Sequence, residues 1–182
     1  MVGLSCNCGF SPSVLLLLPD HVKRIQVHAE AAYPQECCGL LVGTLSVAEG
    51  GDTRQVHDAI ATANGWNETV SEDLAVEFAS YQAAAADCHS KADRFWIDPK
   101  DILRVQRQAR DRNLDIVGVY HSHPEHPAVP SECDRTIAWN DYSYVILAVY
   151  GGRVADIQSW VLDRNQQFQA ERMGEPTPDI LQ

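Results

Sequence analysis

Two histidines separated by one residue, His121 and His123, stand at the end of an apolar stretch, and Asp134 follows them closely. Residues i and i+2 of a strand point to the same side, so we expect both imidazoles to face one point. Two imidazoles and one carboxylate suit Zn²⁺ in a tetrahedral site whose fourth position is left for water. Zinc lowers the pKa of such a water to about 7. The sequence therefore predicts a metal centre that can generate hydroxide.

A serine three residues before the aspartate adds to this pattern. The pair Ser131 and Asp134 has the spacing of a helix-capping box, which would fix the carboxylate at the start of a helix. The Ser131 hydroxyl could also donate a hydrogen bond to an oxyanion that develops during hydrolysis. The two roles are compatible, and both are kept as predictions.

A hydrolase of this type needs a general base beside the metal-bound water. The best remote candidate is Glu36, which stands at the start of the apolar stretch Cys37–Val42. A carboxylate at the lip of an apolar strand can point into a site and have its pKa tuned by its surroundings. Without further information, the default interpretation of Glu36 is a solvated loop carboxylate.

The elements that must position these residues follow from hydrophobic patterning and turn signals. We predict strands over Val14–Leu18, Gly39–Ser46, Arg54–Ala63, Arg94–Ile97, Asp115–His121, Ser143–Tyr150, Arg153–Leu162 and Gln167–Ala170. We predict helices from Pro19 to about Tyr33, from Ser71 to about Cys88, from Pro99 to near Asn113 and from Ser131 to about Asp141. This mixture predicts an α+β fold with a mixed β-sheet flanked by helices.

The length of 182 residues suits one domain. We expect a loose extension over residues 1–13, the domain over 14–172 and a disordered tail over 173–182. A net charge of −11 argues against binding to nucleic acid or to an anionic membrane surface, because both require basic patches. The six cysteines are irregularly spaced, so we interpret them as reduced and the protein as cytoplasmic.

Several stretches together resemble the JAMM (MPN-domain) zinc metalloprotease family. They are PxECCGLLxG around Glu36, GVYHSHP with the two histidines, PSxxD and the following YSYVILAV. The family signature is a glutamate, then His-x-His, seven residues, serine, two residues and aspartate, and this chain fits it without departure over a resemblance that covers about residues 14–162. The resemblance implies that His121, His123 and Asp134 bind one zinc ion, that Glu36 is the acid/base and that Ser131 stabilises the tetrahedral intermediate.

The resemblance also suggests a substrate class. Eukaryotic members cleave isopeptide bonds to ubiquitin, and some carry a long insertion after the metal-site helix. Here only residues 135–142 separate Asp134 from the next strand, and HPAxPSExD is most similar to short bacterial members. Those members are associated with ubiquitin-like sulfur-carrier proteins, from whose C-terminus they release a residue or peptide. We further expect the segment Trp66–Asp93 to form a helical insertion that contacts the carrier.

Other interpretations of these residues remain open. The chain could be a non-catalytic MPN-type binding module with a structural metal, or a deubiquitinase-like isopeptidase. Cys133 could be a nucleophile, although its side chain should point away from the Asp134 side. The prolines around His126 indicate a loop residue rather than a ligand. Among the tryptophans, Trp66 could be exposed and contact a partner, and the others are expected in the core: Trp96, Trp139 and Trp160.

Overall fold

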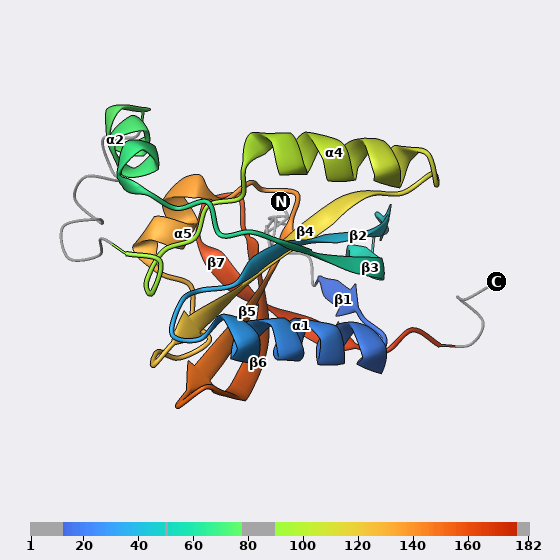
Figure 1. Ribbon diagram of the computed structural model, residues 1–182. Coiled ribbons are helices and arrows are strands. Elements are labelled where there is room, and N and C mark those ends of the chain that lie inside the picture. The colour runs from blue at the N-terminus through green and yellow to red at the C-terminus, as the bar shows by residue number, and fades with distance from the viewer. Residues whose placement is uncertain (1–12, 50, 78–89, 178–182) are drawn as a thin grey trace, which may run out of the picture.

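The computed structural model describes residues 13–49, 51–77 and 90–177 (Figure 1). Its strands are β1 (Val14–Leu16), β2 (Cys38–Ser46), β3 (Thr53–Thr62), β4 (Asp115–Pro124), β5 (Ser143–Tyr150), β6 (Arg153–Leu162) and β7 (Phe168–Gly174). Its helices are α1 (Pro19–Ala32), α2 (Glu68–Glu77), α4 (Pro99–Arg110) and α5 (Glu132–Ile137). The α+β class predicted from the sequence is confirmed.

The sheet is mixed, as predicted, but it closes into a barrel rather than staying open between helices. The strand order is β1-β3-β2-β4-β5-β6-β7, and β1 pairs in parallel with both β3 and β7. Because this short strand bonds on both of its edges, it joins the two ends of the sheet. The expected architecture of a sheet flanked by helices is corrected accordingly.

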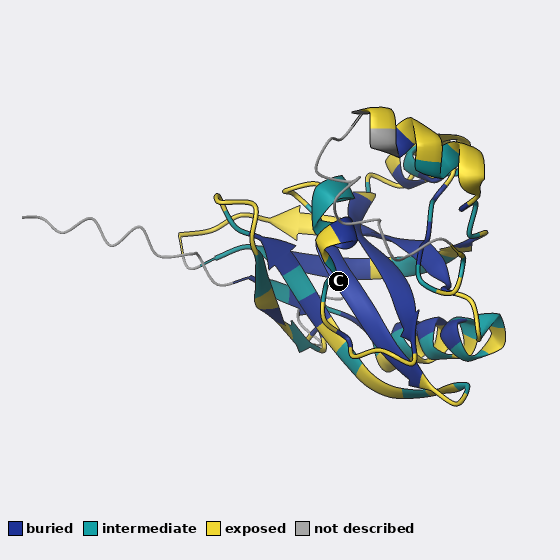
Figure 2. Ribbon diagram, turned by 90° about the vertical axis from the view of Figure 1, so that its left-hand side faces the viewer, coloured by how far each residue is buried: buried dark blue, intermediate teal, exposed yellow. Residues whose placement is uncertain are grey.

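Two helices cover opposite faces of the central strands. Neighbouring residues Leu40 and Leu41 of β2 belong to different buried clusters, because side chains alternate along a strand. Ile25 of α1 packs in the cluster of Leu41, whereas Val105 of α4 packs in that of Leu40. Figure 2 shows the resulting pattern, in which buried strands lie between helices whose outer surfaces are exposed.

Most of the predicted elements are present, and the exceptions have physical causes. Residues 94–97 do not form a strand, since the backbone N–H of Trp96 bonds to the side chain of Asn64 at 3.2 Å instead of to a ladder partner. The last strand continues to Gly174, because Met173 and Gly174 pair with β1. Met173 and Gly174 of the expected tail therefore belong to this strand, and its residues 178–182 lie outside the described part.

The helix predicted from Ser71 begins earlier, at Glu68, because the side chain of Asn67 accepts a hydrogen bond from the Val70 backbone at 3.1 Å and so caps the helix. Its predicted end lies outside the described residues. The α5 helix ends at Ile137, short of the predicted Asp141.

The tryptophans reverse two expectations. Trp66 is only 3% exposed, packed with Leu74 and Cys133, whereas Trp139 is 53% exposed. Among the described cysteines, Cys37 and Cys38 are free thiols, and Cys6, Cys8 and Cys88 lie outside the described residues. None of the described helices has the length and apolar character needed to cross a membrane.

Candidate metal centre

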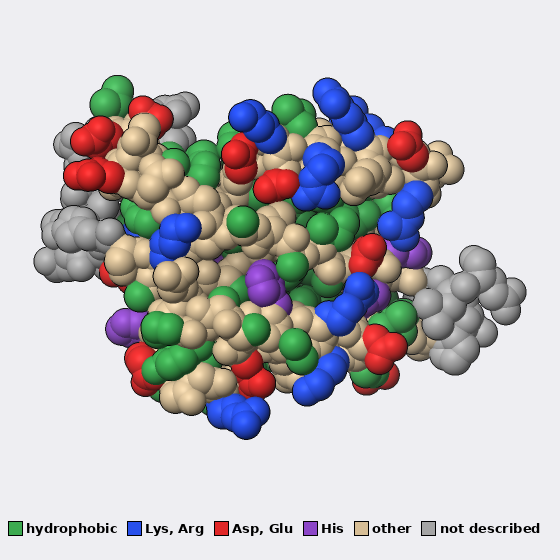
Figure 3. Space-filling model, viewed as in Figure 1, with side chains coloured by type: hydrophobic (Ala, Val, Ile, Leu, Met, Phe, Trp, Pro, Cys, Tyr) green, Lys and Arg blue, Asp and Glu red, His purple; other side chains and the backbone are tan. Residues whose placement is uncertain are grey.

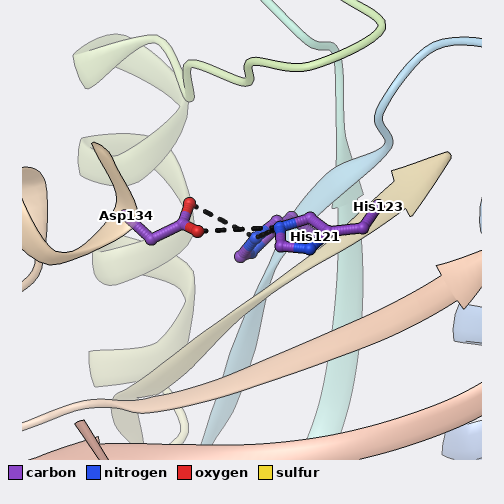
Figure 4. A group of neighbouring side chains, drawn as sticks. All are labelled: His121, His123 and Asp134. Atoms are coloured by element: carbon purple, nitrogen blue, oxygen red, sulfur yellow. Dashed lines mark hydrogen bonds and ion pairs between the residues drawn. The ribbon is translucent and has the colours of Figure 1, made fainter. Parts of the chain in front are cut away.

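The two histidines are held by β4, which lies between β2 and β5. His121 is paired with Cys38 on one side and with Ile146 on the other, so its backbone is fixed by both neighbours. The side chains of His121 and His123 converge, with 2.9 Å between their Nε2 atoms (Figure 4). Ser122 faces away, where its Oγ accepts a hydrogen bond from the Cys37 backbone at 2.8 Å. The arrangement predicted for the His-x-His pair is therefore present.

The carboxylate of Asp134 comes from the first turn of α5 and faces both imidazoles (Figure 4). Ser131 caps this helix, and the capping box expected from the spacing is complete. The Asp134 Oδ2 accepts from the Ser131 backbone at 2.6 Å and from its hydroxyl at 2.7 Å. Asp134 Oδ1 lies 3.4 Å from His121 Nε2, and Oδ2 lies 3.6 Å from His123 Nε2.

These three side chains fit a metal ion. Their ligand atoms all lie within 4.8 Å of one another, and all three residues are buried. Tetrahedral zinc with bonds of about 2.0–2.1 Å separates its ligand atoms by about 3.3 Å. The two Nε2 atoms are 2.9 Å apart, and each lies 3.4 or 3.6 Å from a different oxygen of the Asp134 carboxylate, all close to this value. The donor set, two nitrogens and one carboxylate oxygen, is one that zinc accepts.

Groups behind the histidines orient the rings. His123 Nδ1 lies 3.0 Å from the Pro127 carbonyl oxygen, which can only accept, so Nδ1 carries the proton and the lone pair of Nε2 is left for a metal ion. The Trp160 indole N–H donates to the Ala128 carbonyl at 3.0 Å and fixes this loop. Phe95 stacks on the His121 ring with centroids 4.4 Å apart. The His123 ring is thus positioned by a hydrogen bond and the His121 ring by packing.

The three side chains of this group influence one another's charge. Burial by itself would raise the pKa of Asp134, but the neighbouring His121 and His123 hold that pKa well below its ordinary value. Burial lowers the pKa of His121, which favours the neutral ring. Burial also opposes charging of His123, but its contact with Asp134 outweighs this and raises the His123 pKa. The ionised carboxylate and neutral imidazoles are the forms that bind metal.

Glu36 is brought to the same site from a distant part of the sequence. It directly precedes Cys37, whose carbonyl accepts a hydrogen bond from the Ser122 backbone at 3.2 Å. The antiparallel register of β2 and β4 therefore places Glu36 opposite His123, on the side that His121 and His123 share.

The side chain of Glu36 is only 5% exposed, so it is not the solvated loop carboxylate of the default interpretation. Burial disfavours its charged form and the negative charge of Asp134 adds to this, so the pKa of Glu36 lies well above its ordinary value, although the Arg94 guanidinium acts in the opposite direction. A carboxylate with a raised pKa beside a metal site has the properties of a general base.

Two nearby residues take no part in this group. Cys133 is buried in the apolar cluster with Trp66 and Leu74, away from the metal ligands, which argues against a nucleophilic thiolate. His126 is exposed in the loop after β4, as predicted.

The structure also shows site features that the sequence did not reveal. A cavity of about 370 Å³ lies beside Asp134, between α4, the central strands and α5. Its walls are almost entirely apolar and include Phe95, Ile102, Ile137 and Trp139. Hydrophobic side chains gather below α4 in Figure 3, while the outer surface of that helix carries lysine and arginine. The lining comes from β2, residues 95–103, β4, residues 134–139 and β5, so no local pattern could have grouped it.

Comparison with known proteins places the chain in a family. The family described as prokaryotic homologs of the JAB domain (Prok-JAB) matches residues 18–163. A desampylase from Haloferax volcanii is 38% identical over 73 residues, which are 40% of this chain and 51% of that protein, so the match spans about half the length of this curated relative. A CysO-cysteine peptidase from Mycobacterium tuberculosis is 25% identical over 149 residues, 81% of this chain and 82% of that protein.

Solved structures agree on the fold. A protein from Salinibacter ruber is similar with a TM-score of 0.60 and 29% identity, over 92% of this chain and 93% of that chain. A protein from Desulfitobacterium hafniense has a TM-score of 0.62 at 21% identity, over 92% and 96%, and shows the fold alone. Since the family match covers well over half of the chain, the protein belongs to the prokaryotic homologs of the JAB domain, which confirms the resemblance to the JAMM family.

Proposed function

We propose that the protein is a zinc-dependent metallopeptidase that hydrolyses a peptide or isopeptide bond at the C-terminus of a ubiquitin-like, sulfur-carrier type protein. The observation that carries this proposal is the convergence of His121, His123 and Asp134 on one point, with the buried Glu36 opposite His123. A metal that served only the fold would not need a carboxylate with a raised pKa beside its ligands.

The residues of the chain divide the chemistry among them. When bound, zinc would polarise the substrate carbonyl and lower the pKa of a water molecule. Glu36 accepts the proton of the attacking water and returns it to the leaving amine. Asp134 is held in its ligand position by the Ser131 cap. The Ser131 hydroxyl donates to Asp134 in this structure, so it must turn from that partner to stabilise an oxyanion.

The comparisons and the cavity support the substrate class. The relative from Mycobacterium tuberculosis is by name a peptidase that acts on a CysO–cysteine linkage, and it matches most of this chain. The cavity beside Asp134 lies in the size range of ligand sites, which begins at about 300 Å³. We expect the C-terminal residues of the carrier to lie along this apolar cavity, with the bond to be cleaved at the metal.

The test is to incubate the zinc-loaded protein with carrier proteins that bear C-terminal extensions and to follow the products by mass spectrometry. We expect one cleavage, at the carrier's own C-terminus, and intact carrier as the product. Ubiquitin conjugates in parallel reactions separate the deubiquitinase-like alternative. Cleavage of none of these substrates by the zinc-loaded protein would contradict the proposal and favour the binding-module alternative.

The contact between the segment Trp66–Asp93 and the carrier is a further part of this proposal. Its described portion includes α2, on which Val76 is 88% exposed. We expect Val76→Asp to raise KM several-fold with little change in kcat, because an apolar contact is lost without disturbing the metal site. Val47→Asp is the matched control, since Val47 is 73% exposed on the turn after β2. Equal KM values in both variants would argue against this contact.

A further inference from the structure

Asn64 stands just after β3 and uses every hydrogen-bonding position of its side-chain amide. Its Nδ2 donates to the backbone carbonyls of Glu36 at 3.1 Å and Arg94 at 2.8 Å. Its Oδ1 accepts from the backbone N–H groups of Trp66 at 3.0 Å and Trp96 at 3.2 Å. An asparagine amide has two donor hydrogens and two acceptor lone pairs, so all four are used here. One side chain therefore joins three separate segments of backbone.

The same segments are joined by backbone contacts around Asn64. The Glu36 N–H donates to the Lys91 carbonyl at 2.6 Å, and the Lys91 ammonium donates to the Asn64 carbonyl at 2.6 Å. The Gly65 N–H donates to the Trp96 carbonyl at 2.8 Å. Both backbone polar groups of Glu36 are thus tied to this cluster, at a point where β2 has not yet begun.

This anchoring matters because Glu36 occupies an unfavourable place for a carboxylate. Its side chain is buried and shares the site with Asp134, so burial and the Asp134 charge both disfavour a carboxylate in this place. Before β2 begins, Cys37 bonds to Ser122 of β4, whereas the backbone of Glu36 itself is held by Asn64 and Lys91. A shift of about 1 Å in a reacting group can cost about 100-fold in rate.

We propose that Asn64 is a positioning residue for Glu36: its side chain fixes the backbone of the base opposite His123 and joins it to the segment whose Phe95 stacks on His121. This inference rests on the proposed function, because it assigns Asn64 a part in the reaction through Glu36. A loop clamp with no part in the reaction would contribute to stability alone. The two possibilities differ in what they do to kcat, to KM and to the bound metal.

Two substitutions and a matched control separate these possibilities. Asn64→Ala removes all four hydrogen bonds, whereas Asn64→Asp keeps the size of the side chain but loses both donors. Asp163→Ala is the control, because the Asp163 carboxylate likewise holds loop backbone, at Asn165 and Gln167 in the turn between β6 and β7, but takes no part in the site. We expect Asn64→Ala to lower kcat by about 10–100-fold, the range for groups that orient a site, with KM and zinc content within about twofold of the unaltered protein. Asp163→Ala should change none of these.

A double-mutant cycle tests whether the effect passes through Glu36. Combined with Glu36→Gln, Asn64→Ala should cost no further rate beyond about twofold, because the base that Asn64 holds is already gone. A full 10–100-fold loss in the Glu36→Gln background would overturn the inference. Should Asn64→Ala fail to fold, Asn64→Asp takes its place in the same cycle.

Two readouts do not depend on any substrate. The visible spectrum of the Co²⁺-substituted protein should be the same with and without Asn64→Ala, since Asn64 bonds to no metal ligand. A changed spectrum would show that Asn64 supports the ligands and would overturn the assignment. Hydrogen exchange of the Glu36 amide should be faster in Asn64→Ala than in the unaltered protein and unchanged in Asp163→Ala. An unchanged rate in Asn64→Ala would also overturn the assignment. If the unaltered protein cleaves no carrier, the proposed function fails, and the exchange rates still decide whether Asn64 holds Glu36.

Discussion

Glu36→Gln should lower kcat for carrier cleavage by about 10²–10⁴-fold, the usual contribution of a general base. The amide has the shape of the carboxylic acid but cannot accept the proton of the attacking water. The candidate ligands are His121, His123 and Asp134 and do not include Glu36, so the variant should keep one zinc ion per chain. Steady-state kinetics and metal analysis of the purified protein measure both quantities.

The control for this substitution is Glu132→Gln. Glu132 lies in the first turn of α5, next to the metal site in sequence, but its side chain is 68% exposed and pairs with Arg135. We expect its kcat to stay within about twofold, because an exposed pair of this kind contributes little. Unchanged turnover in Glu36→Gln would remove Glu36 from the role of base, and loss of zinc in that variant would indicate a ligand instead.

Removal of zinc should abolish cleavage and leave the fold in place. Without the metal, the pKa of water rises again far above 7, so almost no hydroxide is available at neutral pH. The backbone of both histidines is held in β4 by pairing with β2 and β5, and Asp134 is held by the Ser131 cap, so none of these elements depends on the ion. We expect at least a 100-fold loss of rate, recovered when zinc is added back.

Dialysis against a chelator, with circular dichroism before and after, distinguishes catalysis from a structural role. Retained secondary structure with lost and recoverable cleavage supports the proposed enzyme. A chelator that unfolds the chain would support a structural metal, as in the binding-module alternative. Cleavage that survives complete removal of the metal would contradict a zinc mechanism altogether.

The ligand constellation was accessible from the sequence because it is local. His121 and His123 share one strand, and Ser131 and Asp134 share one helical turn, so their geometry follows from the periods of these elements. The position of Glu36 depends on pairing between β2 and β4, which are separated by residues 47–114. Local spacing could not supply that pairing, and the resemblance to a known family did.

The errors arose where distant segments decide the outcome. Val14–Leu16 reads as a strand, but nothing in it shows that it pairs with both β3 and β7 and closes the barrel. Residues 94–97 have the composition of a strand, yet their backbone bonds to the side-chain amide of Asn64, at the Arg94 carbonyl and the Trp96 N–H, in place of a neighbouring strand. Trp66 looks like a loop residue and Trp139 like a helical core residue, and their burial is reversed because α2 covers Trp66.

The packing of Cys133 limits which variants of α2 can test recognition of the carrier without also changing catalysis. Cys133 precedes Asp134, the proposed ligand, and lies against Trp66 and Leu74, so α2 packs against the helix that carries this carboxylate. Deleting α2 would expose this apolar cluster and loosen the carboxylate at the same time. A fall in activity after such a deletion would therefore carry no information about the carrier. Only changes confined to the outer side of α2, such as those at Val76, can measure substrate recognition by itself.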